Sequence, residues 1–216
     1  MNKTKIDWCD ATVNPVMGCP RGCEYCYARK LNTRFKLVED WSKPQFFPER
    51  LKQFECKKPK SIFINSMSDI GFWKEEWRQE LFHAMIHNPQ HFYIALTKCE
   101  EVYIPYWVRQ ELRGRFFLGQ TQTSGFVYNG FNEKYREFLS AEPLHGELHF
   151  NSFGGIRAVI VGAETGKRKD KVIPKKEWVD DIVQQCDDKH IAVFMKESLR
   201  ELMGEDFRQD KLPWMV

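Results

Sequence analysis

Short apolar runs recur along the chain, and most are followed by a longer stretch with helical spacing of its apolar positions. The runs lack a strict alternation of apolar and polar residues, which is typical of parallel strands covered on both faces. We therefore expect strands over 8–16, 61–65, 91–96, 115–119, 136–140, 158–162 and 191–195.

The intervening stretches predict helices, because their apolar residues return at every third or fourth position. The expected helices cover 26–37, 73–87, 100–113 and 175–188. The clearest apolar stripes are Trp73, Trp77, Leu81 and Met85 in the second, and Trp178, Ile182 and Cys186 in the last.

Strands that alternate with helices indicate a parallel α/β fold. Six or seven strands are fewer than the eight of a complete barrel. We expect a partial parallel (β/α)6-type TIM-like barrel that forms a single domain over 1–216. An open doubly wound sheet is the alternative, but no Gly-rich dinucleotide fingerprint follows any of the runs.

Composition narrows the class of protein. The chain has 216 residues, 42% of them hydrophobic and 29% charged, which is a globular composition. No apolar run is long enough for a membrane helix, and the polar first residues lack a secretory signal. Seven cysteines, an odd number, argue against a disulfide framework. We expect a cytoplasmic protein that does not bind a membrane.

Three of the cysteines, Cys19, Cys23 and Cys26, lie within eight residues of one another, in a segment that contains Pro20 and Gly22. This spacing, among Gly, Pro, Arg and Glu, is not typical of cysteines that serve as apolar residues of a buried core. Three thiolates are one short of a closed zinc site and one short of full ligation of a 4Fe–4S cluster. A structural zinc completed by Cys9, Cys56 or a histidine is therefore an alternative to an iron–sulfur cluster with an open position.

The spacing Cys-x3-Cys-x2-Cys, with Tyr25 before the last cysteine, resembles the signature of the radical S-adenosylmethionine superfamily. The resemblance implies that the three cysteines hold a 4Fe–4S cluster whose fourth iron binds S-adenosylmethionine. It also implies reductive cleavage of S-adenosylmethionine to methionine and a 5′-deoxyadenosyl radical, with a reductant protein such as flavodoxin or ferredoxin as a partner.

A narrower resemblance covers nearly the whole chain. Its motifs are Lys5-Ile-Asp-Trp-Cys-Asp-Ala-Thr-Val-Asn-Pro15, Ile62-Phe-Ile-Asn-Ser-Met-Ser-Asp69, Leu96-Thr-Lys98, Ser140-Ala-Glu-Pro-Leu144 and Val161-Gly-Ala-Glu-Thr-Gly166. In this order they resemble a phage-associated three-cysteine-motif family of unknown function that is grouped with radical S-adenosylmethionine proteins. That resemblance implies a separate partner protein. Gln120-Thr-Gln-Thr-Ser124 departs from the family, which often has an acid there.

Polar residues follow the expected strands, where a barrel of this type opens its site. The segment Ser66, Met67, Ser68 and Asp69 follows the second strand of the barrel, and we expect it to bind the ammonium group of S-adenosylmethionine. An N-cap at Ser68 or Asp69 is compatible with that role. The other expected cofactor-binding residues are Tyr25, Gln120 and Gln122, and the expected catalytic residues are Lys98, Glu142, Glu164 and Lys196.

A basic loop, Lys167-Arg-Lys-Asp-Lys171, directly follows Gly166. Lys and Arg contact phosphates without reading sequence, so a nucleotide or a nucleic acid is an expected substrate. The net charge of +3 is too small to identify a nucleic-acid-binding protein by itself. The competing class is a zinc-stabilised nucleic-acid-binding module without catalysis.

Overall fold

The computed structural model describes residues 2–128 and 136–215. Within them the chain is a mixed α/β protein, and its contacts divide it into two compact units. The first unit holds the described residues up to Phe117, and the second runs from Leu118 to Met215. Strand β7 (Phe116–Thr121) contains the boundary. The expected single domain stays a prediction.

A row of strands forms the centre of the first unit, in the order β1 (Asn2–Lys3), β2 (Ala11–Thr12), β5 (Ser61–Phe63) and β6 (Phe92–Thr97). β1 is antiparallel to β2, whereas β2, β5 and β6 are parallel. Ile62 lies opposite both Ala11 and Tyr93, and all three side chains are buried. The burial agrees with parallel strands covered on both faces.

The expected strand over 8–16 is wrong in its length. Only Ala11–Thr12 joins the row, and Val16–Met17 forms a separate strand, β3, that pairs with β4 (Gln45–Phe46) in antiparallel orientation. Pro15 lies between them, and proline has no N–H with which to continue a ladder.

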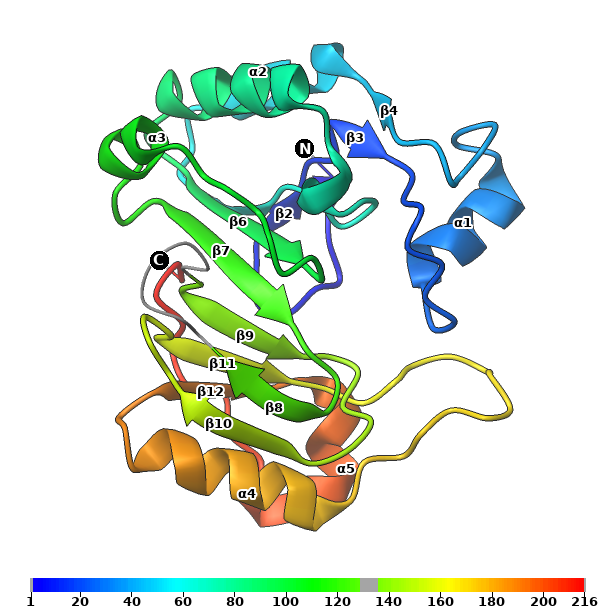
Figure 1. Cartoon of the computed structure of the whole chain (residues 1–216), viewed down its shortest axis with the longest axis vertical. Helices are drawn as coiled ribbons and strands as arrows, with labels where there is room; N and C mark the ends of the chain where they lie inside the picture. Colours follow the sequence, from blue (N-terminus) through cyan, green and yellow to red (C-terminus); the bar gives the residue numbers. More distant parts are fainter. Residues whose placement is uncertain (1, 129–135, 216) are drawn as a thin grey trace. The chain divides into compact units, whose positions relative to one another are not determined.

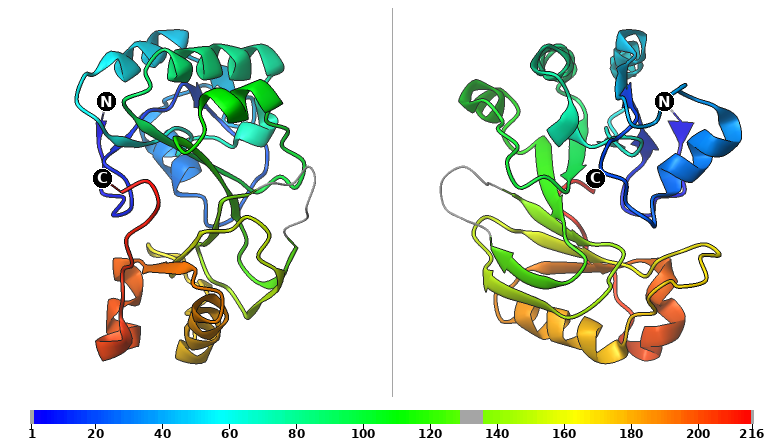
Figure 2. Two further views of the ribbon diagram at one scale, coloured as in Figure 1. Left: turned by 90° about the vertical axis from the view of Figure 1, so that its left-hand side faces the viewer. Right: turned by 45° about the vertical axis from the view of Figure 1, so that its right-hand side comes forward.

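Three α-helices and two 3-10 helices complete the first unit: α1 (Tyr27–Phe35), η1 (Pro48–Glu55), η2 (Ile70–Phe72), α2 (Glu75–Ile86) and α3 (Tyr106–Glu111). α2 and α3 lie over one face of the strands (Figures 1 and 2). The expected helices over 26–37 and 73–87 are confirmed, whereas the one over 100–113 is shorter. Pro105 is its N-cap, and a residue before proline avoids helical geometry, so the helix begins after Ile104.

Four parallel strands form the sheet of the second unit, in the order β7, β9 (Phe138–Ala141), β11 (Ala158–Val161) and β12 (Ala192–Met195). These match the expected runs. A separate parallel pair, β8 (Gly125–Tyr128) and β10 (Leu148–Ser152), was not expected. The apolar run of β8, Phe126-Val-Tyr128, is short, and β10 (Leu-His-Phe-Asn-Ser) alternates apolar and polar residues instead of forming a continuous apolar run.

Helix α4 (Lys176–Asp187) packs against this sheet (Figures 1 and 2). Its buried residues include Ile182 and Cys186, as the apolar stripe predicted, and Val179, while Trp178 is only partly buried. The side chain of Gln185 accepts from Phe150 N at 2.9 Å and donates to Leu148 O at 3.0 Å, which ties α4 to β10. After β12 come η3 (Glu197–Leu199), α5 (Arg200–Met203) and η4 (Gly204–Asp206).

The expected α/β fold with parallel strands is confirmed. Across residues 2–128 and 136–215, no helix combines the length and the apolar character that a membrane crossing needs.

Candidate metal and cofactor site

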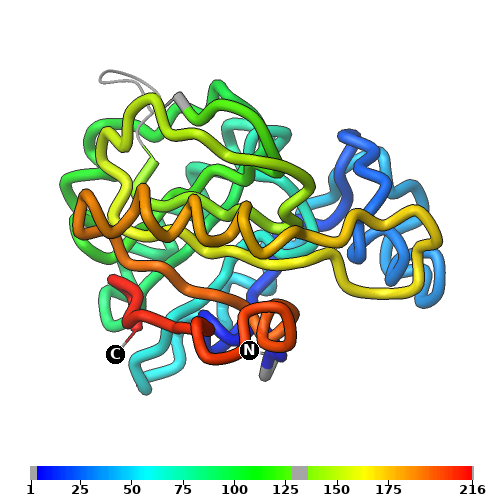
Figure 3. Tube along the Cα trace, turned by 90° about the horizontal axis from the view of Figure 1, so that it is seen from below, coloured from blue at the N-terminus to red at the C-terminus, as the bar shows by residue number. Residues whose placement is uncertain are grey.

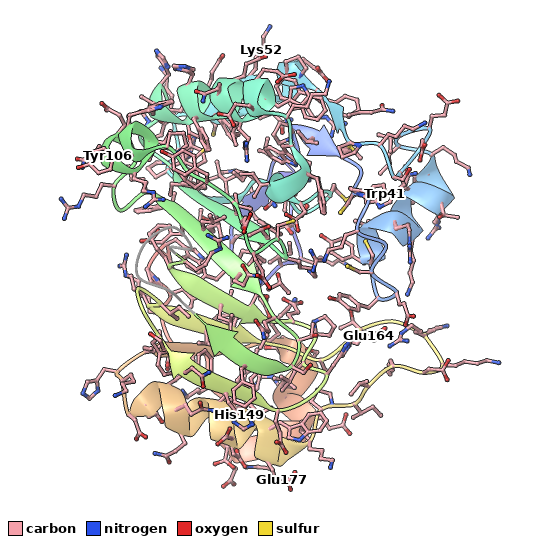
Figure 4. All side chains as sticks on the ribbon, in the orientation of Figure 1. Trp41, Lys52, Tyr106, His149, Glu164 and Glu177 are labelled. Atoms are coloured by element: carbon pink, nitrogen blue, oxygen red, sulfur yellow. The ribbon has the colours of Figure 1, made fainter. Side chains whose placement is uncertain are left out.

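The cysteine loop, residues 18–26, lies between β3 and α1 in the first unit and is fixed at its start by the backbone. Gly18 N donates to Met67 O at 3.1 Å, and Cys19 N donates to Trp41 O at 2.7 Å (Trp41 is labelled in Figure 4). Gly18 has a φ of +103°, and a Cβ there would lie 3.0 Å from Trp41 O and 3.1 Å from Lys43 O. Only glycine fits this position without strain, so the sequence dictates where the loop begins.

The end of the loop is fixed by the helix that follows. Cys26 is the N-cap of α1, and its Sγ accepts from Arg29 N at 3.4 Å. Arg29 also donates from Nη2 to Cys23 O at 2.9 Å. Gly22, with a φ of +74°, supplies the turn between the first two cysteines. The three thiols are therefore presented by a loop that is anchored at both ends.

Each of the three cysteines is free and partly buried. The pKa of Cys19 is raised to about 11. Burial is the main cause, and negative charge on Asp69, Cys23 and Cys26 contributes to the same rise. Burial and the neighbouring Cys23 also raise the pKa of the Tyr25 hydroxyl. The thiols are thus close enough that a negative charge on one disfavours the ionisation of another.

Three soft thiol donors on one anchored loop have the chemistry that an iron–sulfur cluster takes, so the donor set fits the expected group. Within the described part of the chain, no group of three or more His, Cys, Asp or Glu residues is arranged to hold a metal ion. The ligand role of Cys19, Cys23 and Cys26 stays a prediction.

The segment 66–69 lies directly beside the cysteine loop. Gly18 and Ser68 form a parallel bridge, and Tyr27 donates its hydroxyl to Ser66 O at 2.6 Å. Asn14 Oδ1 accepts from Ser66 Oγ at 3.0 Å and from Met67 N at 2.9 Å. Two motifs about fifty residues apart in the sequence are therefore neighbours in space.

Asp69 is 7% exposed, and both of its carboxylate oxygens accept hydrogen bonds from the chain. Oδ1 accepts from Gly71 N at 3.0 Å and from Thr97 Oγ1 at 2.6 Å, and Oδ2 accepts from Lys98 N at 2.8 Å. Asp69 is the N-cap of η2, as the capping interpretation held. It also fixes the end of β6, and its expected contact with a cofactor stays a prediction.

Two residues that follow β6 reach the cysteine loop. Lys98 Nζ lies 5.7 Å from the centre of the Tyr25 ring, within the range of a cation–π contact. Arg21 Nη1 lies 3.9 Å from Cys99 Sγ. Of the residues expected in the site, the first unit thus brings together the three cysteines, Tyr25, the segment 66–69 and Lys98.

The other expected catalytic residues lie at the strand ends of the second unit. Lys196 Nζ and a carboxylate oxygen of Glu142 are in direct contact. Both side chains pass over Gly162, where a Cβ would lie 3.0 Å from Lys196 Cδ and 3.4 Å from Glu142 Cγ. The small residue after β11 therefore makes room for the ion pair between the ends of β9 and β12.

Glu164 is 7% exposed and belongs to a second charged cluster at the end of β11 (Figure 4). Arg168 donates from Nε and Nη2 to its two oxygens, both at 2.8 Å, and His145 Nε2 lies 3.5 Å from Oε2. A bidentate Arg–carboxylate pair of this kind holds both side chains in place. Arg168, which the sequence assigned to a phosphate-binding loop, is thus held at the root of that loop.

The two expected glutamines make contacts of their own. Gln120 Oε1 accepts from Arg136 Nε at 3.3 Å. Gln122 Nε2 donates to Ser124 O at 3.1 Å and to Phe126 O at 2.7 Å, and so shapes the turn into β8. These bonds are sufficient to explain both residues structurally, and their cofactor role stays a prediction.

Sequence reasoning missed four residues that position the site: Asn14, Arg29, Thr97 and His145. Asn14 and Thr97 lie in the quoted motifs, next to Pro15 and Lys98, so the motifs carried a signal that was not assigned a role. Arg29 and His145 had no such signal, because their partners are known only once the loops are folded.

The chain belongs to a family described as "Protein of unknown function (DUF5131)", whose sequence profile matches residues 3–201. No curated protein and no solved structure matches it.

Proposed function

We propose that this chain is a radical S-adenosylmethionine enzyme that binds one 4Fe–4S cluster through Cys19, Cys23 and Cys26. The observation that carries the proposal is the contact between the cysteine loop and the segment 66–69, through Gly18 and Ser68. It supports a cofactor site, because the residues expected to ligate iron and those expected to bind S-adenosylmethionine lie side by side.

When bound, such a cluster would supply the electron for reductive cleavage of S-adenosylmethionine. The chain's own residues would hold that cofactor beside the loop. Asp69, with its carboxylate fixed by three donors, would present a negative charge to the ammonium group. Tyr25, partly buried and next to Lys98, would exclude water from the same place. We extend the proposal to a partial parallel barrel, as the parallel strands of both units support.

The charged residues at the strand ends of the second unit are the candidates for contacts with the substrate. Lys196 and Glu142, in contact and only partly exposed, form an ion pair that could position a polar group of the substrate. Glu164, held by Arg168, fixes the start of loop 163–175, which extends beyond the N-terminal end of α4 (Figure 3). In this proposal the loop receives a nucleotide or nucleic acid, and a reductant protein and a separate partner protein act with the chain.

A zinc-stabilised nucleic-acid-binding module is a second candidate, and one contact favours it. The approach of Arg21 to Cys99 Sγ, at 3.9 Å, brings a fourth thiol next to the cysteine loop. Four thiolates would close a tetrahedral zinc site. The two candidates therefore differ in what Cys99 does.

Metal analysis after anaerobic purification separates them. We expect iron and sulfide with a broad absorption near ~400 nm, and loss of iron when Cys19, Cys23 or Cys26 is changed to Ala. Cys99→Ala and the buried control Cys186→Ala should keep their iron. One zinc per chain that is lost in Cys99→Ala would overturn the radical enzyme in favour of the zinc module.

The substrate class is tested on the lysines of the basic loop, because Arg168 in the same loop is already paired with Glu164. Lys167 and Lys169 are exposed and Lys171 is half-buried, so a variant with all three changed to Ser spares Arg168. If they contact phosphates, the slope of log affinity against log salt should fall by ~0.7–0.9 per lysine. An unchanged slope, or no binding of RNA or DNA by the wild type at low salt, would contradict a nucleic-acid substrate.

A further inference from the structure

Helix α1 presents its largest apolar side chains to solvent. Tyr27, Leu31 and Phe35 are 52%, 38% and 56% exposed, and Leu37, just beyond the helix, is 41% exposed. The three helical residues are spaced by four, so they form one stripe along the helix. We call Tyr27, Leu31, Phe35 and Leu37 the α1 face. Contiguous exposed apolar surface of this kind marks an interaction site.

The opposite side of α1 supplies the buried contacts of the helix, and the Tyr27 hydroxyl, which donates to Ser66 O, adds an anchor at one end of the α1 face. Ala28 and Asn32 are the buried residues of α1. The Asn32 side chain donates to Val38 O at 3.1 Å and accepts from Val38 N at 2.8 Å, and Ala28 packs with Val38 in a small core cluster. The chain thus packs α1 mainly through a small and a polar residue and leaves much of the apolar surface of the α1 face exposed.

Basic residues are interspersed along the α1 face, while the exposed Glu24 and Glu39 lie just outside it in the sequence. Residues 27–38 contain four basic residues and no acidic one. Lys30, Arg34 and Lys36 are exposed, and the Arg34 guanidinium lies 5.0 Å from the centre of the Phe35 ring. The complementary surface is apolar at its centre and acidic at its rim, as in a protein partner with negative charge.

The α1 face lies next to the proposed cluster ligands, which indicates a partner that exchanges electrons with the cluster. Tyr27 directly follows Cys26, the N-cap of α1 and a proposed cluster ligand. Nine helical residues span about 14 Å at ~1.5 Å per residue, so a partner on this face lies close to the cysteine loop. Proximity to a redox centre is what a donor of single electrons requires.

We infer that the α1 face is the docking surface for an acidic electron-donor protein of the flavodoxin or ferredoxin class. The inference rests on the proposed function. In the transfer, the reduced donor loses one electron and the cluster held by the cysteine loop gains one. The apolar stripe supplies contact area, and Lys30, Arg34 and Lys36 orient the donor.

A nucleic acid would also be attracted by the basic residues. Bases stack on aromatic rings, and half of the α1 face consists of the aliphatic Leu31 and Leu37, which offer no stacking surface. The composition therefore favours a protein partner.

The test is calorimetric binding of a purified acidic flavodoxin to the anaerobically purified chain, at low and at moderate salt. Leu31→Ser with Phe35→Ser, and separately Lys30→Glu with Arg34→Glu, should each weaken binding about tenfold or more. Wild-type affinity should fall with salt. The matched control is Lys52→Glu with Tyr106→Ser, an exposed cation and an exposed aromatic elsewhere in the first unit (Figure 4), which should bind like the wild type.

Reductive cleavage of S-adenosylmethionine is then compared with two reductants. Dithionite should drive wild type and variants equally, while flavodoxin should drive only the wild type and the control. Equal flavodoxin binding by all proteins, or wild-type binding to RNA but not to flavodoxin through this face, would overturn the docking surface. Absence of iron and of dithionite-driven cleavage in the wild type would instead overturn the proposed function.

Discussion

Replacement of Asp69 tests how much of the cofactor site depends on one buried carboxylate. Asp69→Ala removes three acceptor contacts at once, those from Gly71 N, Thr97 Oγ1 and Lys98 N. Loss of the N-cap costs ~1 kcal/mol, and each hydrogen bond to a charged acceptor costs at least ~1.5 kcal/mol. We expect the free energy of unfolding to fall by about 4 kcal/mol.

Asp69→Asn separates the structural role from the charge. The amide oxygen can still accept from Gly71 N and Thr97 Oγ1, whereas the amide NH2 faces the donor Lys98 N. We expect a smaller loss of about 1–2 kcal/mol. If the carboxylate receives the ammonium group of S-adenosylmethionine, this variant should keep its iron and bind the cofactor about ten- to a hundredfold more weakly.

Urea unfolding followed by tryptophan fluorescence and circular dichroism measures the stability of both variants, and calorimetry measures cofactor binding. Glu101→Ala, at an exposed glutamate of the same unit, is the control and should change stability by less than ~0.5 kcal/mol. Asp69→Ala with the stability of the control would refute the structural role. Unchanged cofactor affinity in Asp69→Asn would leave Asp69 as a capping residue alone.

Three further predictions concern the two units. Gly18→Ala should lower the free energy of unfolding in urea by about 2–4 kcal/mol and release iron. Gly22→Ala should lower it by only about 1–2 kcal/mol, because the added Cβ lies 4.0 Å from Pro20 O. Equal losses would contradict the crowding at Gly18. Burial raises the pKa of Glu137 to about 7 from an ordinary value of 4.5, so the folded state binds this proton more tightly than the unfolded state does. The stability that this proton contributes is fully present below pH 4.5 and is lost as the pH rises through 7. Glu137→Gln should therefore be more stable than the wild type by about 3 kcal/mol at pH 8, and parallel stability–pH curves for the two proteins would disprove this. Arg168→Ala removes two hydrogen bonds from the buried carboxylate of Glu164 and should lower the free energy of unfolding by about 3 kcal/mol, with only partial recovery in Arg168→Lys; a stable alanine variant would show that the pair is not structural.

Much of the fold could be predicted from the sequence, because long apolar stripes and buried runs determine the elements that carry them. Helix α2 and strands β6 and β11 lie where their patterns placed them. The boundaries that failed are set by proline, at Pro15 and at Pro105, where a missing N–H or a steric restriction overrides the apolar pattern. The pair β8 and β10 was missed because the apolar run of β8 is only three residues long and β10 alternates apolar and polar residues, unlike the buried runs of the other strands.

The candidate site was less accessible to sequence reasoning. Residues at strand ends could be named, but their bonds depend on chain segments far apart in the sequence. Asn14 accepts from Ser66 and Met67 across more than fifty residues. The pairing of Arg168 with Glu164, by contrast, is local. The loop also contains several lysines, so the sequence did not show which basic residue pairs with Glu164.

Binding of S-adenosylmethionine to a cluster on the cysteine loop is tested most directly by electron–nuclear double resonance. The sample is the dithionite-reduced, anaerobically purified chain, with S-adenosylmethionine labelled by ¹⁵N at the amino group. A 4Fe–4S cluster held by only three thiolates has one iron open to the cofactor. We predict a hyperfine coupling between the cluster and the labelled nitrogen, absent from the unlabelled sample. A cluster signal that shows no coupling and does not change with the cofactor, or a chain that carries zinc in place of iron, would contradict it.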